Sequence, residues 1–302
     1  MAEKDDIRWG LQRRFEMIEW RTYWRGRINR SDLEDRFGVS TPQASADLRS
    51  YQEAAPGNIE YDATEKAYVP TAHFQPQFLR VSADRYLIQL DAILNGAVPA
   101  VDTWFGSPVP AAVMPTVARS VDSETLRTLL KAITWRREVE VEYQSLTSAR
   151  QRGIVPHSLA FDGHRWHVRA WCSERLSFRD FVLSRILSVG ALRPSDVDPT
   201  NDVVWNTMVA LKIVAHPALD AAQKKAIERD FGMENGVLIL NSRVALAYYV
   251  IRRLNLDLKE GQISPLRQQI FLTNMAEVEE IEQKAKAEEE SRVRIFSAKL
   301  RK

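Results

Sequence analysis

The chain has 302 residues, of which 45% are hydrophobic and 27% are charged, a balance typical of a globular protein with two or three domains. The formal net charge of +2 provides no global cationic field that would indicate nucleic-acid binding, and the single cysteine, Cys172, excludes an internal disulfide and a cysteine-based zinc cluster. No apolar run is long enough for a signal peptide or a membrane helix, so we expect a soluble, cytoplasmic protein with no membrane partner.

Residues 1–95 are predicted to begin with two helices. Apolar residues recur at helical spacing over residues 7–24, on a helix rich in arginine. Ser31 and Glu34 have the spacing of a capping box at the start of a second, short helix. Gly38 suits the left-handed residue that ends such a helix.

A third helix is predicted directly after this turn. Ser40 provides a hydroxyl cap, and Pro42 suits the first helical turn. The inward face is predicted to hold Ala44, Leu48 and Tyr51. The residues left on the outside or on the flanks are Gln43, Ser45, Ala46, Asp47, Arg49 and Ser50.

Two short strands, residues 58–61 and 67–69, flank a polar turn and predict a hairpin. Each piece alone also fits a plain helical bundle. The ordered series of helix, capped helix, glycine turn, proline-started helix and hairpin is typical of a winged helix-turn-helix domain, which binds DNA.

The third helix is the candidate recognition helix, whose N-terminal residues would meet base edges in the major groove. Gln43 suits adenine, Ser45 suits a base or a phosphate, and Arg49 suits a phosphate. The candidate DNA-binding residues are Arg14, Arg27, Ser40, Thr41, Gln43, Ser45, Arg49 and Lys66. A clamp on the DNA backbone is expected from Arg8, Arg13, Arg14, Arg21, Arg25, Arg27 and Arg30, although these arginines also suit a solubilising role.

Residues 1–75 carry 11 basic and 13 acidic side chains, so bulk electrostatic attraction will not supply the affinity for DNA. Dimerisation would compensate by doubling the contacts. We therefore expect a homodimer on double-stranded operator DNA with an inverted repeat.

Residues 96–118 contain four prolines and two glycines, which predict a semi-rigid linker without a regular helix. A second break at residues 193–200 separates a middle domain, residues 119–193, from a C-terminal extension, residues 194–302. The chain is thus predicted to be an α+β multidomain protein.

The middle domain is predicted to be a small β-barrel of short antiparallel strands. Residues 138–143 alternate strictly, and residues 152–159, 165–171 and 177–186 follow as further strands. Residues 131–193 carry 11 basic and 6 acidic side chains, and ten of the basic ones are arginine. Because arginine presents a planar fork of donors, this bias favours an anionic ligand.

Three motifs in this segment are similar to those of the WYL-domain family. Trp166-His167-Val168 stands where the family has Trp-Tyr-Leu, and it is followed by Arg179-Asp180-Phe181 and Ser184-Arg185-Ile186 at the family's spacing. Pro156-His157 and Asp162-Gly163 match the second strand and its turn. The second and third positions of the name-giving triplet depart from the family, so the role usually given to the tyrosine is open for His167.

The whole-chain layout most resembles the BrxR/CapW-type repressors of phage-defence loci. This resemblance implies an N-terminal winged helix-turn-helix, a central WYL domain with an Sm/SH3-like barrel, and a C-terminal α+β extension that contributes to dimerisation. It also implies that the WYL domain senses a nucleotide or a short nucleic acid.

The parity of the strands independently favours such a ligand site. It places Arg179, Phe181, Leu183 and Arg185 on one strand face, and His167 with Arg169 on a face of another. The candidate ligand-binding residues are Tyr143, Ser145, Arg152, His157, His167, Arg169, Arg179, Phe181 and Arg185. In the alternative interpretation, Phe181 and Trp166 belong to the barrel core and the arginines form a solvated face.

We expect no catalytic residue, no cofactor and no metal site. His164, His167 and Cys172 lack a further closely spaced ligand for tetrahedral zinc, and no phosphate-binding glycine loop or nucleophile elbow is present. Cys172 is interpreted as a small core residue.

The C-terminal extension is predicted to be a small α+β domain. Strands are expected at residues 208–214 and 236–240, and helices at residues 218–231, 243–254 and 276–302.

The sequence thus favours a homodimeric repressor of its own phage-defence operon, relieved by an anionic effector at the WYL domain. The alternatives are an activator of the same architecture, a nucleic-acid-processing enzyme with a winged-helix docking domain, and a protein-interaction scaffold.

Overall fold

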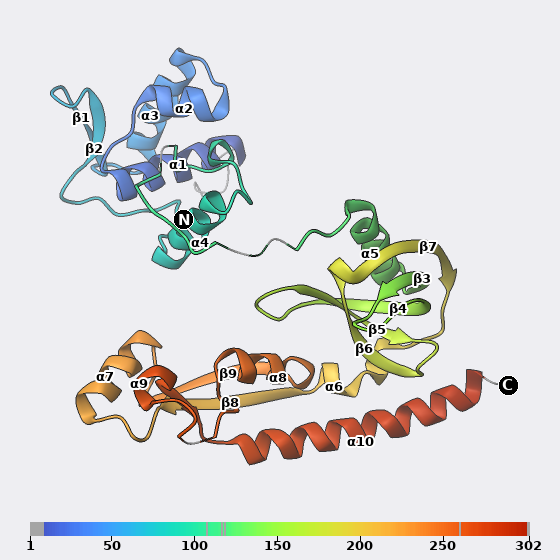
Figure 1. Ribbon diagram of the computed structural model, residues 1–302. Helices are drawn as coiled ribbons and strands as arrows, with labels where there is room; N and C mark the ends of the chain where they lie inside the picture. The colour runs from blue at the N-terminus through green and yellow to red at the C-terminus, as the bar shows by residue number, and fades with distance from the viewer. Residues whose placement is uncertain (1–8, 107, 116, 118, 260, 301–302) are drawn as a thin grey trace. The chain divides into compact units, whose positions relative to one another are not determined.

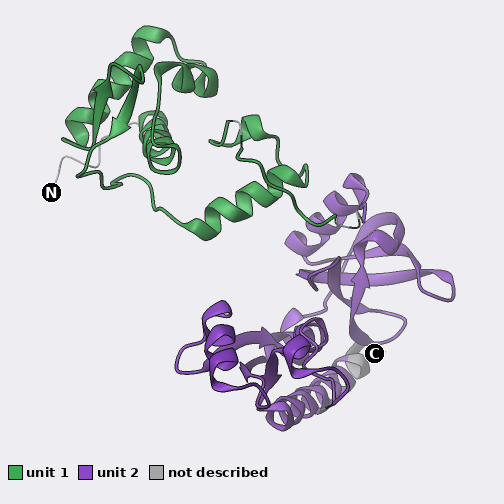
Figure 2. Cartoon of the chain, turned by 60° about the vertical axis from the view of Figure 1, so that its left-hand side comes forward, with its two compact units in different colours: residues 1–117 green, residues 118–302 purple. Residues whose placement is uncertain are grey.

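The computed structural model describes residues 9–300, except 107, 116, 118 and 260. The chain divides into two compact units, residues 1–117 (unit 1) and residues 118–302 (unit 2), each with its own core (Figure 2). We describe each unit by itself.

Unit 1 is helical with a two-stranded hairpin, as predicted (Figure 1). Its elements are α1 (Trp9–Arg25), α2 (Arg30–Phe37), α3 (Thr41–Ala54), β1 (Ile59–Asp62), β2 (Ala67–Pro70), α4 (Ala83–Leu94) and the 3₁₀ turn η1 (Ala100–Asp102). The strands of the hairpin are antiparallel, with Tyr61 opposite Tyr68.

The core of unit 1 confirms the inward face predicted for α3. Ala44, Leu48 and Tyr51 are fully buried, and Phe15 and Ile18 of α1 pack in the same cluster. Gly38 ends α2 in the left-handed conformation, and Ser40 caps α3 by accepting a hydrogen bond from the backbone N–H of Gln43.

Two local predictions for this unit are wrong. The capping box of α2 is formed by Asn29 and Asp32 rather than by Ser31 and Glu34, because the helix begins at Arg30, two residues earlier than a cap at Ser31 implies. Asp47 lies inside the unit rather than on its flank, because an ion pair with α1 compensates its charge, as described below.

The predicted linker contributes side chains to unit 1. Trp104 and Phe105 are buried in the same core as α1, and the ring of Phe105 packs in tilted contacts against those of Trp20 and Tyr86. Residues 98–105 therefore pack as part of this unit, and the described residues between 96 and 117 contain no α-helix.

Unit 2 begins with α5 (Ser123–Trp135) and a five-stranded antiparallel sheet of order β6-β5-β4-β3-β7. Its strands are β3 (Arg137–Gln144), β4 (Ala149–Phe161), β5 (Trp166–Cys172), β6 (Ser177–Val182) and β7 (Ile186–Pro194). Leu129 and Ala132 of α5 cover one face of this sheet. β3, the first strand of this sheet, pairs with both β4 and the last strand, β7, as in a small barrel.

The predicted fourth strand, residues 177–186, is too long. β6 ends at Val182, and the 3₁₀ turn η2 (Leu183–Arg185) leads into β7. The strand parity inferred for Leu183 and Arg185 therefore does not apply, since neither residue belongs to the strand.

The remainder of unit 2 is a three-stranded antiparallel sheet of order β10-β8-β9 with surrounding helices. Its elements are η3 (Pro199–Asn201), α6 (Val203–Asn206), β8 (Met208–Ala215), α7 (Ala221–Asp230), β9 (Val237–Arg243), α8 (Val244–Arg253), α9 (Pro265–Gln268), β10 (Ile270–Leu272) and α10 (Met275–Leu300). Two strands and three helices were predicted here, and each is present at slightly different bounds. The sequence analysis did not predict α6, α9 or β10.

Helix α10 packs along unit 2 through its sparse apolar residues. Val278 and Ala285 are buried, and Val293 and Phe296 pack against Trp171 of β5. None of the helices in the described part of the chain is long and apolar enough to cross a membrane.

Candidate functional site

In Figure 1 the β1–β2 hairpin lies to the left of α2 and α3. A cavity of about 280 Å³ lies between these elements. Its lining includes Arg30 of α2, Thr41 at the start of α3, and Tyr61 and Lys66 of the hairpin. The structure thus brings together the start of the candidate recognition helix and the tip of the predicted wing.

Helix α3 presents polar side chains outward along its length. Thr41, Gln43 and Arg49 are exposed, and Ser45 is half-buried. Ser45 accepts a weak hydrogen bond from Arg30 at 3.5 Å and donates to the carbonyl of Thr41. Within the described residues, no hydrogen bond or ion pair is recorded for Arg49, so its guanidinium remains available to a ligand.

Helix α3 is fixed to α1 by an ion pair. The carboxylate of Asp47 lies 2.6 Å from Nε of Arg14 and accepts a hydrogen bond from the side-chain amide of Gln43 at 2.9 Å. Asp47 is almost completely buried. This pair sets the position of Gln43, one of the candidate base-reading residues.

A second buried carboxylate, Glu19 of α1, holds the segment after the hairpin. Glu19 is fully buried and accepts hydrogen bonds from the backbone N–H groups of Gln77, Phe78 and Leu79 at 2.6–2.8 Å. It also accepts a hydrogen bond from the hydroxyl of Tyr51 on α3. Burial raises the pKa of this Tyr51 hydroxyl.

The predicted arginine clamp is divided between exposed and internal positions. Arg14 and Arg21 are engaged inside unit 1 by Asp47 and Asp32, so their charges are already compensated. Arg13 pairs with Glu16, and the exposed Arg27 pairs with Glu65 of the hairpin. Arg8 lies outside the described residues.

In unit 2, the five-stranded sheet divides the predicted ligand-binding residues between two faces. Phe181 and Tyr143 pack edge-to-face in the core beneath α5, and the hydroxyl of Tyr143 accepts a hydrogen bond from the backbone N–H of Val182. His167 and Arg169 lie on the opposite face, because adjacent residues of a strand alternate.

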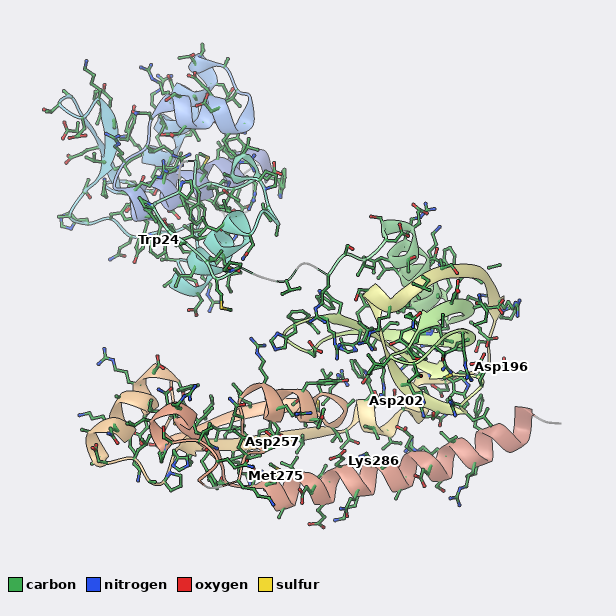
Figure 3. All side chains as sticks on the ribbon, viewed as in Figure 1. Trp24, Asp196, Asp202, Asp257, Met275 and Lys286 are labelled. Atoms are coloured by element: carbon green, nitrogen blue, oxygen red, sulfur yellow. The ribbon has the colours of Figure 1, made fainter. Side chains whose placement is uncertain are left out.

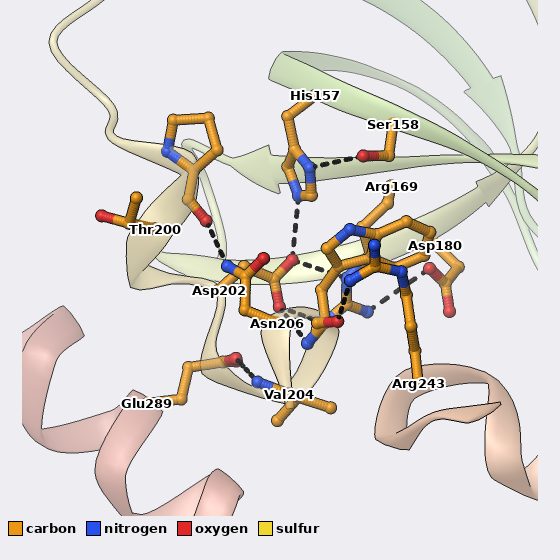
Figure 4. A network of polar contacts seen from close by, with 12 residues as sticks. His157, Ser158, Arg169, Asp180, Thr200, Asp202, Val204, Asn206, Arg243 and Glu289 are labelled. Carbon is orange, nitrogen blue, oxygen red and sulfur yellow. Dashed lines mark hydrogen bonds and ion pairs between the residues drawn. The ribbon is translucent and has the colours of Figure 1, made fainter. Parts of the chain in front are cut away.

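On that second face, buried ionic groups connect the sheet to the C-terminal part. Arg169 donates hydrogen bonds from Nε and Nη2 to the two carboxylate oxygens of Asp202 at 2.8 and 3.0 Å. Nε2 of His157 lies 2.9 Å from the same carboxylate (Figure 4). Asp202 precedes α6 and lies between the five-stranded sheet and α10 (Figure 3).

The carboxylate of Glu289 on α10 also borders this cluster. It accepts a hydrogen bond from the backbone N–H of Val204 at 3.0 Å (Figure 4). Burial and the nearby negative charge of Asp202 raise the pKa of Glu289 to about 7. Burial alone would raise the pKa of Asp202, but hydrogen bonds from His157 and Arg169 lower it below its usual range. Of these two carboxyl groups, Glu289 therefore has the raised pKa and Asp202 the lowered one.

His167 is engaged by the turn between β4 and β5. Its Nε2 lies 2.9 Å from the carboxylate of Asp162, and its ring packs against Tyr249 of α8. Its Nδ1 is buried and has no hydrogen-bond partner in the described structure. Burial alone would raise the pKa of Asp162, but the hydrogen bonds from His167 and two backbone N–H groups lower it.

The remaining predicted ligand-binding residues lie nearer the surface. Arg179 is exposed, and Arg152 and Arg185 are half-buried. Ser145 stabilises its own turn by accepting from the backbone N–H of Ser148 at 3.0 Å. The nine predicted residues thus do not converge on one cavity, because Tyr143 and Phe181 pack in the core, whereas His157 and Arg169 bind Asp202.

In the part of the chain that the structure covers, no group of three or more His, Cys, Asp or Glu side chains is arranged to hold a metal ion. Cys172 is buried in the sheet core, and burial raises the pKa of its thiol.

Comparison with known families matches each part of this architecture. The profile of the BrxR transcriptional regulator winged helix-turn-helix domain matches residues 10–92, that of the WYL domain matches residues 124–190, and that of the BrxR C-terminal dimerization domain matches residues 208–278. The fold and these matches define a winged-helix transcriptional regulator with a central WYL domain.

Individual relatives match almost the whole chain. The DNA-binding transcriptional repressor CapW of Escherichia coli strain KTE188 is 39% identical over 91% of this chain and 93% of its own length. The CapW repressor of Stenotrophomonas maltophilia is 38% identical over 91% and 93%, and that of Pseudomonas aeruginosa is 39% identical over 92% and 94%. The chain belongs to the CapW family of DNA-binding transcriptional repressors.

A solved structure was also matched, the proteasome accessory factor B/C (PafBC) of Arthrobacter aurescens. The match covers 95% of this chain at 14% identity, with a TM-score of 0.24. The chain spans about half the length of that protein, 49%.

The sequence analysis missed the residues that organise both units. Glu19, Asp202 and Glu289 are separated in sequence from the groups they bind, so no local pattern marks them. The one available signal was a charged residue at an otherwise apolar helical position, as at Glu19.

Proposed function

We propose that this chain is a homodimeric, sequence-specific transcriptional repressor that binds an inverted-repeat operator through unit 1. The observation that carries this proposal is the position of the N-terminal half of α3 beside the hairpin. Thr41 at the start of α3 lines one cavity with Lys66 at the wing, and Gln43 and Arg49 of the same helix are exposed.

Each of these residues has a stated role in the proposal. Gln43 reads a base edge, because its side-chain amide can both donate a hydrogen bond to adenine and accept one from it. Its hydrogen bond to Asp47 already fixes its rotamer. Arg49 and Lys66 contact phosphates, which sets the register but not the sequence preference. Ser40, Thr41, Ser45 and Arg27 line the approach to the same DNA. Arg14 acts indirectly, through Asp47.

Dimerisation is assigned to the C-terminal part of unit 2. The family profile that matches residues 208–278 is named for this role. A two-fold dimer presents two recognition helices to half-sites that are related by inversion.

The regulatory part of the proposal is that an anionic effector, a nucleotide or an oligonucleotide, binds the WYL domain and relieves repression of the chain's own phage-defence operon. The exposed guanidinium of Arg179 and the half-buried ones of Arg152 and Arg185 support an anionic ligand. The buried cluster around Asp202 provides the connection through which a change in the five-stranded sheet would reach α10.

A gel-shift titration on the DNA upstream of the chain's own gene tests the proposal. We expect a discrete complex that resists scrambled competitor DNA and is lost in the Gln43→Ala/Arg49→Ala double variant. The matched control is Arg127→Ala, which removes an exposed arginine of α5 that lies outside residues 208–278. Equal binding of scrambled DNA, with or without short oligonucleotides, would contradict the proposal.

A further inference from the structure

A cavity inside unit 1 is lined by three arginines that no part of the proposed DNA interface uses. Its volume is about 190 Å³. Arg13 of α1, Arg36 of α2 and Arg85 of α4 converge on it, together with Gln89, Asp102 and Trp104. Three guanidinium groups thus face one lining carboxylate, that of Asp102, so the cavity has an excess of positive charge.

Two of these arginines are held in place by neighbouring groups. The guanidinium of Arg13 lies 4.7 Å from the ring centroid of Trp104, and its Nη1 pairs with Glu16 at 2.6 Å. Arg36 donates from Nη2 to the backbone carbonyl of Asp102 at 3.1 Å. These contacts fix the planes of two guanidinium groups before any ligand arrives.

The bonding of Arg36 is incomplete. Its Nε is buried and has no hydrogen-bond partner in the described structure. A buried donor without a partner is unfavourable, so an acceptor within reach of this Nε would stabilise the unit. Arg85 is exposed at the mouth, and no hydrogen bond or ion pair is recorded for it among the described residues.

We propose that this cavity binds a small phosphate group, as inorganic phosphate or as the phosphate end of a phosphomonoester. Arginine forks match the oxygens of phosphate in geometry and charge. The cavity, at about 190 Å³, is large enough for a phosphate group.

The position of the cavity gives such a ligand a structural effect. Its walls include Val98 and residues 102–104, which precede the segment that leaves unit 1, as well as Arg36 near the end of α2. A bound phosphate would fasten this segment to the helix-turn-helix. The inference does not depend on the proposed operator binding, because it concerns unit 1 without DNA.

Isothermal titration calorimetry of the full-length protein with inorganic phosphate, in a chloride buffer of constant ionic strength, tests this inference. We expect one site per chain. Arg85→Ala and Arg36→Lys should each weaken binding by about tenfold or more, because each removes a charge-assisted hydrogen bond. Because Arg36→Lys keeps the positive charge and removes the Nε donor, it controls for a loss of phosphate binding that is caused by misfolding.

The matched control is Arg80→Ala, which removes another exposed arginine of unit 1 outside the cavity lining and should leave phosphate binding unchanged. No saturable phosphate binding, or equal binding by the wild type and both cavity variants, would overturn the inference. Repeating the titration with operator DNA bound identifies the source of the phosphate. Binding that persists supports a free ligand, whereas competition by DNA indicates that a backbone phosphate occupies the cavity.

Discussion

Asp202 accepts two hydrogen bonds from the guanidinium of Arg169, so a residue that precedes α6 compensates a buried charge on β5. Both side chains are more than nine-tenths buried. This pair joins the five-stranded sheet to the C-terminal part of unit 2 and gives the first prediction.

Replacing Asp202 by alanine should destabilise the protein by about 3–5 kcal/mol, because Arg169 would remain buried without its main partner. Chemical denaturation followed by circular dichroism measures this change. The matched control is Asp257→Ala, which breaks an exposed pair with Arg252 at 3.7 Å and should cost less than about 1 kcal/mol. Similar losses for the two variants would contradict the role given to Asp202.

The raised pKa of Glu289, about 7, predicts a specific dependence of stability on pH. Between its usual pKa of about 4.5 and 7, the folded chain holds a proton that the unfolded chain has released. The free energy of unfolding should therefore fall as the pH rises through this window and level off above it. The Glu289→Gln variant should lack this part of the slope and should be more stable than the wild type at pH 8.

Thermal unfolding of the wild type and Glu289→Gln from pH 4.5 to 8.5 checks this prediction, since the difference between the two proteins removes contributions from the histidines. The control variant Glu290→Gln alters the exposed neighbour of Glu289 on α10. Parallel curves for the wild type and Glu289→Gln would contradict the raised pKa.

Arg14 and Arg49 were both predicted to contact DNA, but the structure gives them different surroundings. Arg14→Ala should cost about 3 kcal/mol of stability, because it leaves Asp47 buried beside Gln43 alone. Arg49→Ala should change stability by less than about 0.5 kcal/mol, because the side chain is exposed. It should instead reduce the slope of log affinity against log salt by about one unit.

Denaturation and fluorescence anisotropy at several salt concentrations separate these two effects. If Arg14→Ala left stability unchanged and lowered only the salt slope, its side chain would contact phosphate rather than position α3.

Arg179→Ala should abolish the response to an anionic effector while leaving operator affinity intact, because the residue is exposed on β6 and belongs to unit 2. Release of the operator complex by nucleotides or short oligonucleotides provides the assay. Arg175→Ala, which changes an exposed arginine in the preceding turn, serves as the control. An unchanged response of the Arg179 variant would remove this residue from the effector site.

Local patterns predicted most of the fold. The buried face of α3, the left-handed end of α2 and the alternation of β3 depend on residues within a few positions of one another, which periodicity and capping rules describe. The exact start of α2 was not predicted, because Asn29 and Ser31, two positions apart, are both suitable N-cap residues.

Such local patterns could not predict the polar contacts in the interior. Asp47 and Arg169 look like solvent-exposed residues until Arg14 and Asp202 are brought against them by folding. The predicted set of ligand-binding residues was too large for a similar reason. Strand parity shows which residues share a face of the sheet, but it does not show which of them the C-terminal part covers.

Hydroxyl-radical footprinting on the DNA upstream of the chain's own gene shows whether two copies of this chain read an inverted repeat through α3. We predict two protected half-sites related by two-fold symmetry, with centres one or more helical turns apart, and their loss in the Gln43→Ala/Arg49→Ala variant. A single asymmetric footprint, or a symmetric one that persists in this variant, would contradict it.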